Sequence, residues 1–202
     1  MIRYYRWMEI TIGRGFSATE RGRVAALYWA AFSRKLGPAF ASVERGLSVV
    51  TASLRSDRTL IARSGNNLVG MCGFHRDGAG AVPVTWRSLR ASLPWLAAVR
   101  ATLVLSPLSR GDMDDTLVLD GICVDGASRG RGTGTALLEA AVELARSEGL
   151  RSVRLSVVDT NPRAEALYRR RGFEQVATGS MGPLSSVYGF DRYTTMERRV
   201  NA

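Results

Sequence analysis

A glycine-rich segment between a hydrophobic run and a helical pattern is the part of the sequence best suited to bind phosphate. It reads Val124-Asp-Gly-Ala-Ser-Arg-Gly-Arg-Gly-Thr-Gly-Thr-Ala136. Backbone N–H groups at the start of a helix are unpaired and carry partial positive charge, and glycine lets a ligand approach the backbone closely. Arg129 and Arg131 add formal positive charge. We therefore predict that this turn binds a pyrophosphate group.

The spacing of the glycines distinguishes between kinds of phosphate site. A dinucleotide fingerprint needs G-x-G-x-x-G, and neither Gly130 nor Gly132 is followed by the third glycine that this requires. A P-loop needs a lysine before serine or threonine, and the segment contains no lysine. The pattern present is Arg-x-x-Gly-x-Gly, from Arg129 to Gly134. An ordinary glycine-rich helix entry is the weaker interpretation, because glycine loses the most entropy on ordering.

A second pattern follows at helical spacing. It is Asn161-x-x-Ala164-x-x-Leu167-Tyr168-x-x-x-Gly172-Phe173. Together the two patterns resemble those of the GNAT acyltransferase superfamily, whose coenzyme A signature is Gln/Arg-x-x-Gly-x-Gly/Ala and whose fourth helix carries the second motif. They cover roughly residues 119 to 173 at the separation typical of that superfamily. One motif alone is weak evidence, whereas two in register are specific.

The resemblance implies an α/β (α+β) fold with a mixed central sheet of about six to seven strands, flanked by helices and splayed between the fourth and fifth strands. Acetyl-CoA, the co-substrate, would lie in that gap. The N–H of Ile122 would polarise the thioester carbonyl, and the strand end through Cys123 to Val124 would bond the pantetheine. The pyrophosphate would be held by the amides of the turn: Arg129, Gly130, Arg131, Gly132, Thr133, Gly134 and Thr135.

The second motif supplies the remaining positions that the resemblance assigns. Tyr168 matches the family's general acid, which protonates the leaving thiolate. Helical geometry places Ala164 and Tyr168 on one face, which would border the cofactor. A core tyrosine with its hydroxyl at the surface is the alternative. Asn161 either contacts pantetheine or only caps its helix, and the sequence leaves both open.

A base is also required, because an ammonium group cannot attack a carbonyl carbon. Asp120 is the best candidate: strand alternation places its side chain on the same face as Ile122 and Val124, and some relatives carry a base at this position. It would act as the base through a water molecule or with a raised pKa, or it would only orient the amine or pair with arginine. Cys72 and Cys123 lie in apolar runs and are interpreted as buried thiols. With one histidine, His75, and no C-x-x-C motif, no metal site is predicted.

Composition restricts the partners and the compartment. The 202 residues contain 28 lysine and arginine residues against 18 acidic ones, a net charge of +10, but Lys35 is the only lysine and the arginines are scattered. Without a basic stripe or reading motif we predict no nucleic-acid partner. Without an apolar run of spanning length or a signal-peptide core we predict no membrane partner and a cytoplasmic location. The length favours a single N-acetyltransferase-like domain over residues 1–202, approximately 8–200.

Periodicity places these residues on an ordered series of elements. Met8–Ile12 alternates as a first strand, and Ser17 to Glu20 forms a capping box before a helix that Gly37-Pro38 ends. A second helix is expected over about residues 39–54, and a hairpin turns at Gly65. The later elements are expected as strand 116–124, helix 134–148, strand 152–158, a helix from Asn161 to Gly172, and strands near 174–177 and 193–200.

Residues 75–115 are predicted to be a helical insertion between the third and fourth strands. It lies toward the acceptor side of the fold that the sequence resembles. Its apolar residues would wall a pocket with an acidic entrance that favours a cationic amine. The wall would comprise Trp86, Leu89, Leu93, Trp95 and Leu96, and the entrance Asp112, Asp114, Asp115 and Asp120. Alternatively the aspartates cap helices or pair with arginines, and the insertion packs on a partner subunit in a homodimer.

Two functional classes follow from these residues. The first is an enzyme that transfers an acetyl group from acetyl-CoA, by direct attack, to a primary amine of a small molecule or a peptide. The second is a non-catalytic module that binds acyl-CoA as a signal. Tyr168 and Asp120 favour the enzyme, because a pure binder needs neither. Fold similarity does not identify the acceptor.

Overall fold

The strands of the protein form one mixed sheet, in a computed structural model that describes residues 5–7, 10–106 and 113–200. The strand order is β1-β2-β3-β4-β5-β6-β8-β7. β5 and β6 are parallel, and the other neighbouring pairs are antiparallel. The strands are β1 (Tyr5–Trp7), β2 (Ile10–Arg14), β3 (Thr59–Ser64), β4 (Asn67–His75), β5 (Thr116–Val124), β6 (Ser152–Val158), β7 (Glu174–Ser180) and β8 (Arg192–Arg199).

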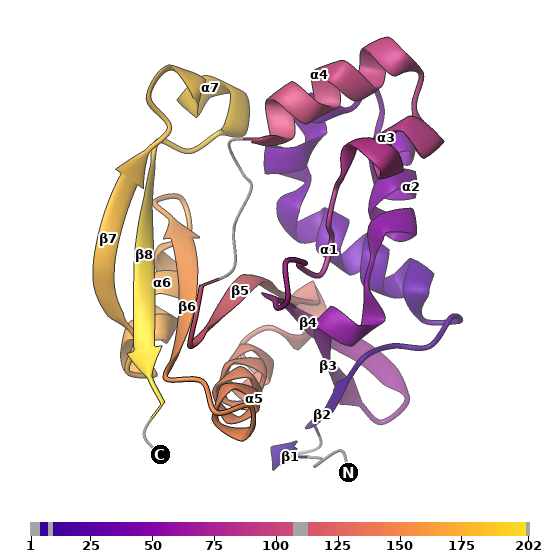
Figure 1. Ribbon diagram of the computed structural model, residues 1–202. Coiled ribbons are helices and arrows are strands. Elements are labelled where there is room, and N and C mark those ends of the chain that lie inside the picture. The colour runs from indigo at the N-terminus through magenta and orange to yellow at the C-terminus, as the bar shows by residue number, and fades with distance from the viewer. Residues whose placement is uncertain (1–4, 8–9, 107–112, 201–202) are drawn as a thin grey trace.

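Helices cover both faces of this sheet (Figure 1). Between β2 and β3 lie α1 (Arg21–Leu36) and α2 (Val43–Ser53), and between β4 and β5 lie α3 (Trp86–Ser92) and α4 (Trp95–Leu105). After β5 come α5 (Thr133–Ser147), α6 (Pro162–Arg170) and the short α7 (Ser185–Tyr188). Of the described helices, none is long and apolar enough to cross a membrane.

Two hydrophobic clusters hold the layers together. On one face α5 packs its alanine and leucine side chains against β2, β4, β5 and β6, and Tyr168 of α6 belongs to this cluster. On the other face α1 to α4 pack together against Ile61 and Met71 of the sheet. Figure 1 shows α1 to α4 gathered on one side of β4 and β5, with α5 on the other side. The strands between these layers are buried on both faces, as their near-continuous apolar sequence requires.

Local sequence signals explain where most elements begin and end. Ser17 and Glu20 exchange the predicted capping-box hydrogen bonds, from Ser17 N to Glu20 Oε2 at 2.8 Å and from Glu20 N to Ser17 Oγ at 3.3 Å. The hairpin of β3 and β4 turns at Gly65, whose φ of +55° suits glycine. Asn161 caps α6 and Pro162 occupies its first position. These predicted elements are confirmed.

The structure also departs from some of the predicted elements. The second helix begins four residues later than expected, at Val43, because the Ser42 side chain caps it there by accepting from Arg45 N. Tyr5–Trp7 form an additional edge strand antiparallel to β2, so the described sheet has eight strands rather than six or seven. The predicted strand residues Met8 and Glu9 lie outside the described part of the chain. The helical insertion is confirmed, and Pro94, the N-cap of α4, separates its two helices.

Candidate functional site

The sheet opens between β5 and β6. These are the fourth and fifth of the predicted strands, because β1 was not predicted, so the opening lies where the resemblance implied it. The two parallel strands pair from Thr116 with Ser152 to Val118 with Arg154. Among the described residues no strand pairs with β5 on this side beyond Val118, so Leu119–Val124 diverge from the second half of β6. Backbone groups along an unpaired strand edge can hydrogen-bond an extended ligand. The expected pantetheine positions Ile122, Cys123 and Val124 all lie on this stretch of β5.

A β-bulge in β5 corrects one prediction about Asp120. Gly73 of β4 pairs with Gly121, but the next residue, Phe74, pairs with Leu119, so Asp120 is the extra residue. A bulge shifts the alternation of the strand by one residue. Ile122 and Val124 therefore pack against the α5 cluster. Asp120 points to the opposite face, toward α1, and the prediction that it shares a face with Ile122 and Val124 is wrong.

The glycine-rich turn leads from β5 into α5 with the backbone conformations that glycine permits. Gly130 and Gly132 have φ values of +75° and +82°, and Gly132 is the N-cap of α5. A Cβ atom added at either glycine would have no other atom within 4 Å, so the space beside the turn is open. Arg129 and Arg131 are exposed there. An open, positively charged helix start fits the pyrophosphate that the sequence predicted.

Other residues of the turn hold its shape. The Asp125 carboxylate accepts a hydrogen bond from Ala127 N at 3.1 Å and pairs with Arg23 of α1. Thr133, which is buried, donates from its hydroxyl to Ser128 O at 3.3 Å. A Cβ at Gly134 would contact Leu167 of α6 at 3.4 Å, so this glycine lets α6 approach α5. The turn is therefore fixed by its neighbours on both sides before any ligand binds.

α6 presents the face that the sequence analysis expected. Ala164 and Leu167 pack against the α5 cluster and Tyr168 is buried within it, with its ring 6.2 Å from that of Phe173. The arginines at positions 163, 169 and 170 are exposed. Asn161 Oδ1 accepts a hydrogen bond from Ala164 N at 3.2 Å, which is the capping role left open by the sequence. Tyr168 and Asp120 thus lie on opposite faces of the sheet, on either side of the opening beside β5.

Asp120 has a partner that the sequence analysis did not propose. His75, at the end of β4, places its Nε2 atom 2.5 Å from Asp120 Oδ1, while Asp120 Oδ2 accepts a hydrogen bond from Ala81 N at 2.7 Å. Both side chains are largely buried, with 15% of His75 and 12% of Asp120 exposed. The sequence analysis considered His75 only in predicting that there is no metal site. The available signal was that His75 directly follows the predicted hairpin, at the start of the segment predicted as the insertion.

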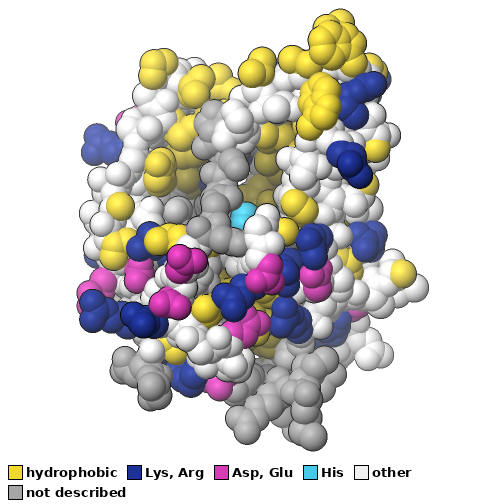
Figure 2. Space-filling view, viewed as in Figure 1, with side chains coloured by type: hydrophobic (Ala, Val, Ile, Leu, Met, Phe, Trp, Pro, Cys, Tyr) yellow, Lys and Arg dark blue, Asp and Glu magenta, His cyan; other side chains and the backbone are white. Residues whose placement is uncertain are grey.

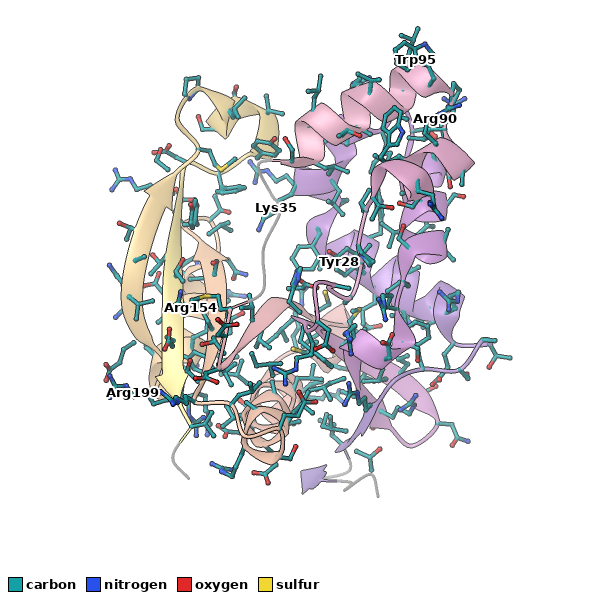
Figure 3. The ribbon with its side chains drawn as sticks, in the orientation of Figure 1. Tyr28, Lys35, Arg90, Trp95, Arg154 and Arg199 are labelled. Atoms are coloured by element: carbon teal, nitrogen blue, oxygen red, sulfur yellow. The ribbon has the colours of Figure 1, made fainter. Side chains whose placement is uncertain are left out.

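The pair lies in the wall of a cavity of about 450 Å³ on the helical side of the sheet. We call it the acceptor-side pocket; it is lined by α1, the 75–85 segment, α3, the end of α4 and Asp120. Figure 2 shows the histidine side chain within the hollow on this face. In Figure 3, Tyr28 and Lys35 project from α1 on the same side, and both line the pocket.

The insertion contributes less to this pocket than predicted. Trp86 and Leu89 line it, but Leu93 is buried among the helices. Trp95 and Leu96 are 59% and 71% exposed on the outer side, where Figure 3 shows Trp95 at the far end of α4. They cannot wall the pocket because Pro94 starts a new helix whose first turn points to solvent.

The predicted acidic entrance is also wrong. Of the described residues that line the pocket, Asp120 is the single acidic one. Asp114 is exposed away from it, and Asp115 pairs with Arg151 at 3.3 Å next to the start of β6. Asp112 lies outside the described residues. The aspartates before β5 are close in sequence, but the turn into the strand directs Asp114 and Asp115 outward.

The two cysteines are unsuited to covalent catalysis. Cys72 and Cys123 are fully buried, and burial raises the pKa of both thiols far above its ordinary value. A protonated, inaccessible thiol is a poor nucleophile. Neither cysteine is therefore a candidate nucleophile.

Comparison with known proteins agrees with this geometry. Several solved structures share the fold: a ribosomal-protein-S18-alanine N-acetyltransferase from Escherichia coli (18% identity, TM-score 0.57, covering 96% of this chain and 95% of that chain), Ard1 from Thermoplasma volcanium (18%, 0.60, 96% and 100%) and a GCN5-related N-acetyltransferase from Kribbella flavida (19%, 0.59, 95% and 98%). A search of the curated proteins found no match.

The family assignment rests on the sequence itself. Residues 21–173 match the model of the acetyltransferase (GNAT) family, a span that includes the glycine turn, the opening beside β5 and the helix of Tyr168. The chain therefore belongs to the GNAT acetyltransferase family of enzymes, as its two motifs predicted.

Proposed function

We propose that the protein is an acetyl-CoA-dependent N-acetyltransferase that acetylates a primary amine of a small molecule or a peptide by direct attack. The observation that carries this proposal is the opening of the sheet beyond Val118, with the open glycine turn at its end. The same stretch of β5 has Asp120 on one face, and Tyr168 belongs to the cluster on the other. An acyl donor in the opening would meet both groups.

The donor would be held largely by backbone. The amides from Arg129 to Thr135 would bind its pyrophosphate, with the exposed guanidinium groups of Arg129 and Arg131 adding charge-assisted hydrogen bonds. The unpaired edge from Ile122 to Val124 would bond the pantetheine, and the N–H of Ile122 would polarise the thioester carbonyl. Two residues along a strand span about 7 Å, so Asp120 lies within reach of that carbonyl.

Tyr168 would supply the proton for the departing thiolate. It is mostly buried beside Phe173, where little water competes with the transfer. Asp120, on the other face, would hold the amine or help to remove its proton. The amine nitrogen then bonds to the acetyl carbon as the carbon–sulfur bond breaks.

The test is a screen of primary amines and peptides for release of free coenzyme A from acetyl-CoA. Turnover with at least one amine, and acetylated product by mass spectrometry, is the expected result. Binding of acetyl-CoA by calorimetry without turnover of any amine or peptide would identify the non-catalytic module instead. Absence of both binding and turnover would reject the proposal.

A further inference from the structure

The acceptor-side pocket has a size and a lining that restrict what it can bind. Its volume of about 450 Å³ falls within the range of small-molecule sites. Aromatic and aliphatic side chains supply most of its wall, among them Tyr28, Phe32, Val82, Trp86 and Leu89. The ring of Phe32 is pressed against the backbone of β5, since a Cβ at Gly121 would come within 2.2 Å of it. Such walls favour a ligand with an apolar body.

His75 and Asp120, which we call the dyad, form part of this wall and are enclosed by neighbouring backbone. Ala81 N holds one carboxylate oxygen and His75 Nε2 contacts the other. A Cβ at Gly73 would come within 2.6 Å of Ala81, and one at Gly80 would come within 2.5 Å of Asp120 and 2.6 Å of His75. Glycine at positions 73 and 80 thus lets the 75–85 segment close over the two side chains. A carboxylate that accepts from Nε2–H fixes the tautomer in which Nδ1 is the basic nitrogen.

The charged residues that line the pocket do not suit a polyamine, which carries several positive charges. Asp120 is the single carboxylate among the described lining residues, and Lys35 lines the same pocket. Lys35 lies two helical turns beyond Tyr28, about 10 Å along α1. Its ammonium group is placed over the rings of Phe32 and Phe190, at 5.7 and 5.0 Å from their centroids. A second positive charge on the ligand would be repelled there.

We infer that the pocket binds the acyl acceptor, that this acceptor is a small primary amine with an apolar body and a single positive charge, and that His75, oriented by Asp120, is the general base. His75 is then the catalytic residue and Asp120 the positioning residue. This role for the pocket rests on the acetyl transfer proposed above.

The proton balance of the reaction is complete with these groups. The bound ammonium loses one proton to His75, its nitrogen bonds to the acetyl carbon, and the carbon–sulfur bond breaks. The new amide nitrogen loses a second proton. One of the two protons reaches the coenzyme A sulfur by way of Tyr168, and the other leaves to solvent. The products are the N-acetyl amide and coenzyme A.

The substrate class is tested with a matched pair of amines. Hexylamine and 1,6-diaminohexane share one carbon chain and differ in the second charge. We expect kcat/KM to be roughly tenfold higher for hexylamine, and higher for 2-phenylethylamine than for ethylamine. Lys35→Glu should reverse the preference in the first pair, while Arg87→Glu, an equal charge change at an exposed residue outside the pocket, should not. Equal or better use of the diamine by the wild type, or acetylation of peptides alone, would overturn the substrate class.

The dyad is tested by variants that separate the base from the residue that orients it. His75→Ala should lower kcat by roughly a hundred- to ten-thousandfold, with the KM for acetyl-CoA unchanged, and added imidazole should restore part of the rate. Asp120→Asn should lower kcat by a smaller factor. The double variant should be no slower than His75→Ala, because the two residues act as a unit.

The opposite results would reject the dyad. If Asp120→Asn loses more activity than His75→Ala, and imidazole restores nothing, Asp120 is the base. If kcat is unchanged in His75→Ala, the dyad is structural. In either case the wild type would still turn over an amine, so the proposed function would stand while this inference failed. Failure of the proposed function would instead show as no turnover of any amine or peptide by the wild type.

Discussion

The two sides of the opening beside β5, the proposed donor side and the proposed acceptor side, are built on different principles. On the donor side, a continuous segment from β5 into α5 offers backbone amides at an open helix start, and Gly130 and Gly132 adopt positive φ values there. On the acceptor side, the pocket is formed by side chains from α1, the 75–85 segment, α3, α4 and β5. The donor side is local in sequence, whereas residues of the acceptor side are up to about ninety positions apart, from Tyr28 to Asp120.

This difference explains how each side can change. A backbone site depends on the conformation of a few glycines and tolerates many side chains around it, which suits a donor that stays the same. A side-chain pocket changes with any substitution in its wall, which suits an acceptor that differs between relatives. Variants in the two sides should therefore affect different kinetic constants.

The largest effect is expected at the donor side, from Gly132→Trp. A bulky side chain there would fill the space beside the turn, and its backbone would be strained at a φ of +82°. We expect the Kd for acetyl-CoA, measured by calorimetry, to rise by roughly a hundredfold or more, since several backbone hydrogen bonds to the pyrophosphate are lost together. The wild type should bind acetyl-CoA and not NAD.

Gly65→Trp is the matched control for this variant. Gly65 also has a positive φ, +55°, and open space around it, but it lies in the hairpin turn of β3 and β4. If both variants lose similar thermal stability but only Gly132→Trp loses acetyl-CoA binding, the loss of binding is due to the blocked ligand site and not to destabilisation of the fold. Tight binding of acetyl-CoA by Gly132→Trp would contradict the phosphate turn.

Tyr168→Phe should produce the next largest effect, on the chemical step. Removal of the hydroxyl keeps the ring packed against Phe173 and removes the proton donor. We expect kcat to fall by roughly ten- to ten-thousandfold in a coenzyme A release assay, with the KM for acetyl-CoA little changed. Full activity of this variant would mean that Tyr168 is only a core residue.

The contrast between the two sides also explains what the sequence could predict. The structure confirms three features that depend on local sequence. They are the glycine turn at the start of α5, the capping of α6 by Asn161, and the shared face of Ala164 and Tyr168. The periodicity of the insertion is local too, and it correctly predicts helices. Which of its residues line a pocket depends on the direction of each helix, and the break at Pro94 separates α3 from α4.

The acceptor side required information that no local pattern carries. The face of Asp120 was predicted by simple alternation, but the bulge opposite Gly73 and Phe74 shifts the register by one residue. Its contact with His75 depends on that register and on the return of the 75–85 segment, which is possible because residues 73 and 80 are glycine. Strand pairing across an insertion of this length leaves no periodic signal in the sequence.

A smaller effect than that of Tyr168→Phe is expected on the acceptor side from Gly80→Ala. The added methyl group would lie within 2.5 Å of Asp120 Oδ2 and 2.6 Å of His75 Nε2, so the pair must separate. We expect kcat to fall by roughly ten- to a hundredfold, since misplaced groups lose much of their catalytic effect, while acetyl-CoA binding is unchanged. Gly22→Ala, with open space around the added methyl, is the control. Unchanged kcat in Gly80→Ala would show that the contact between His75 and Asp120 is not needed.

The smallest effect should come from two tryptophans of the insertion that differ in position. Trp86 lines the pocket and is 47% exposed, whereas Trp95 is 59% exposed and lies outside it. We expect Trp86→Ala to raise the KM for the acceptor amine by roughly five- to tenfold, through lost apolar contact, with kcat little changed. Trp95→Ala should leave both constants as they are. Light scattering on both variants tests the alternative that the insertion packs on a partner subunit. If Trp95→Ala converts a dimer to a monomer and Trp86→Ala does not alter the KM for the amine, the insertion is a subunit interface. The apolar wall around the dyad would then be formed by α1 and the 75–85 segment alone.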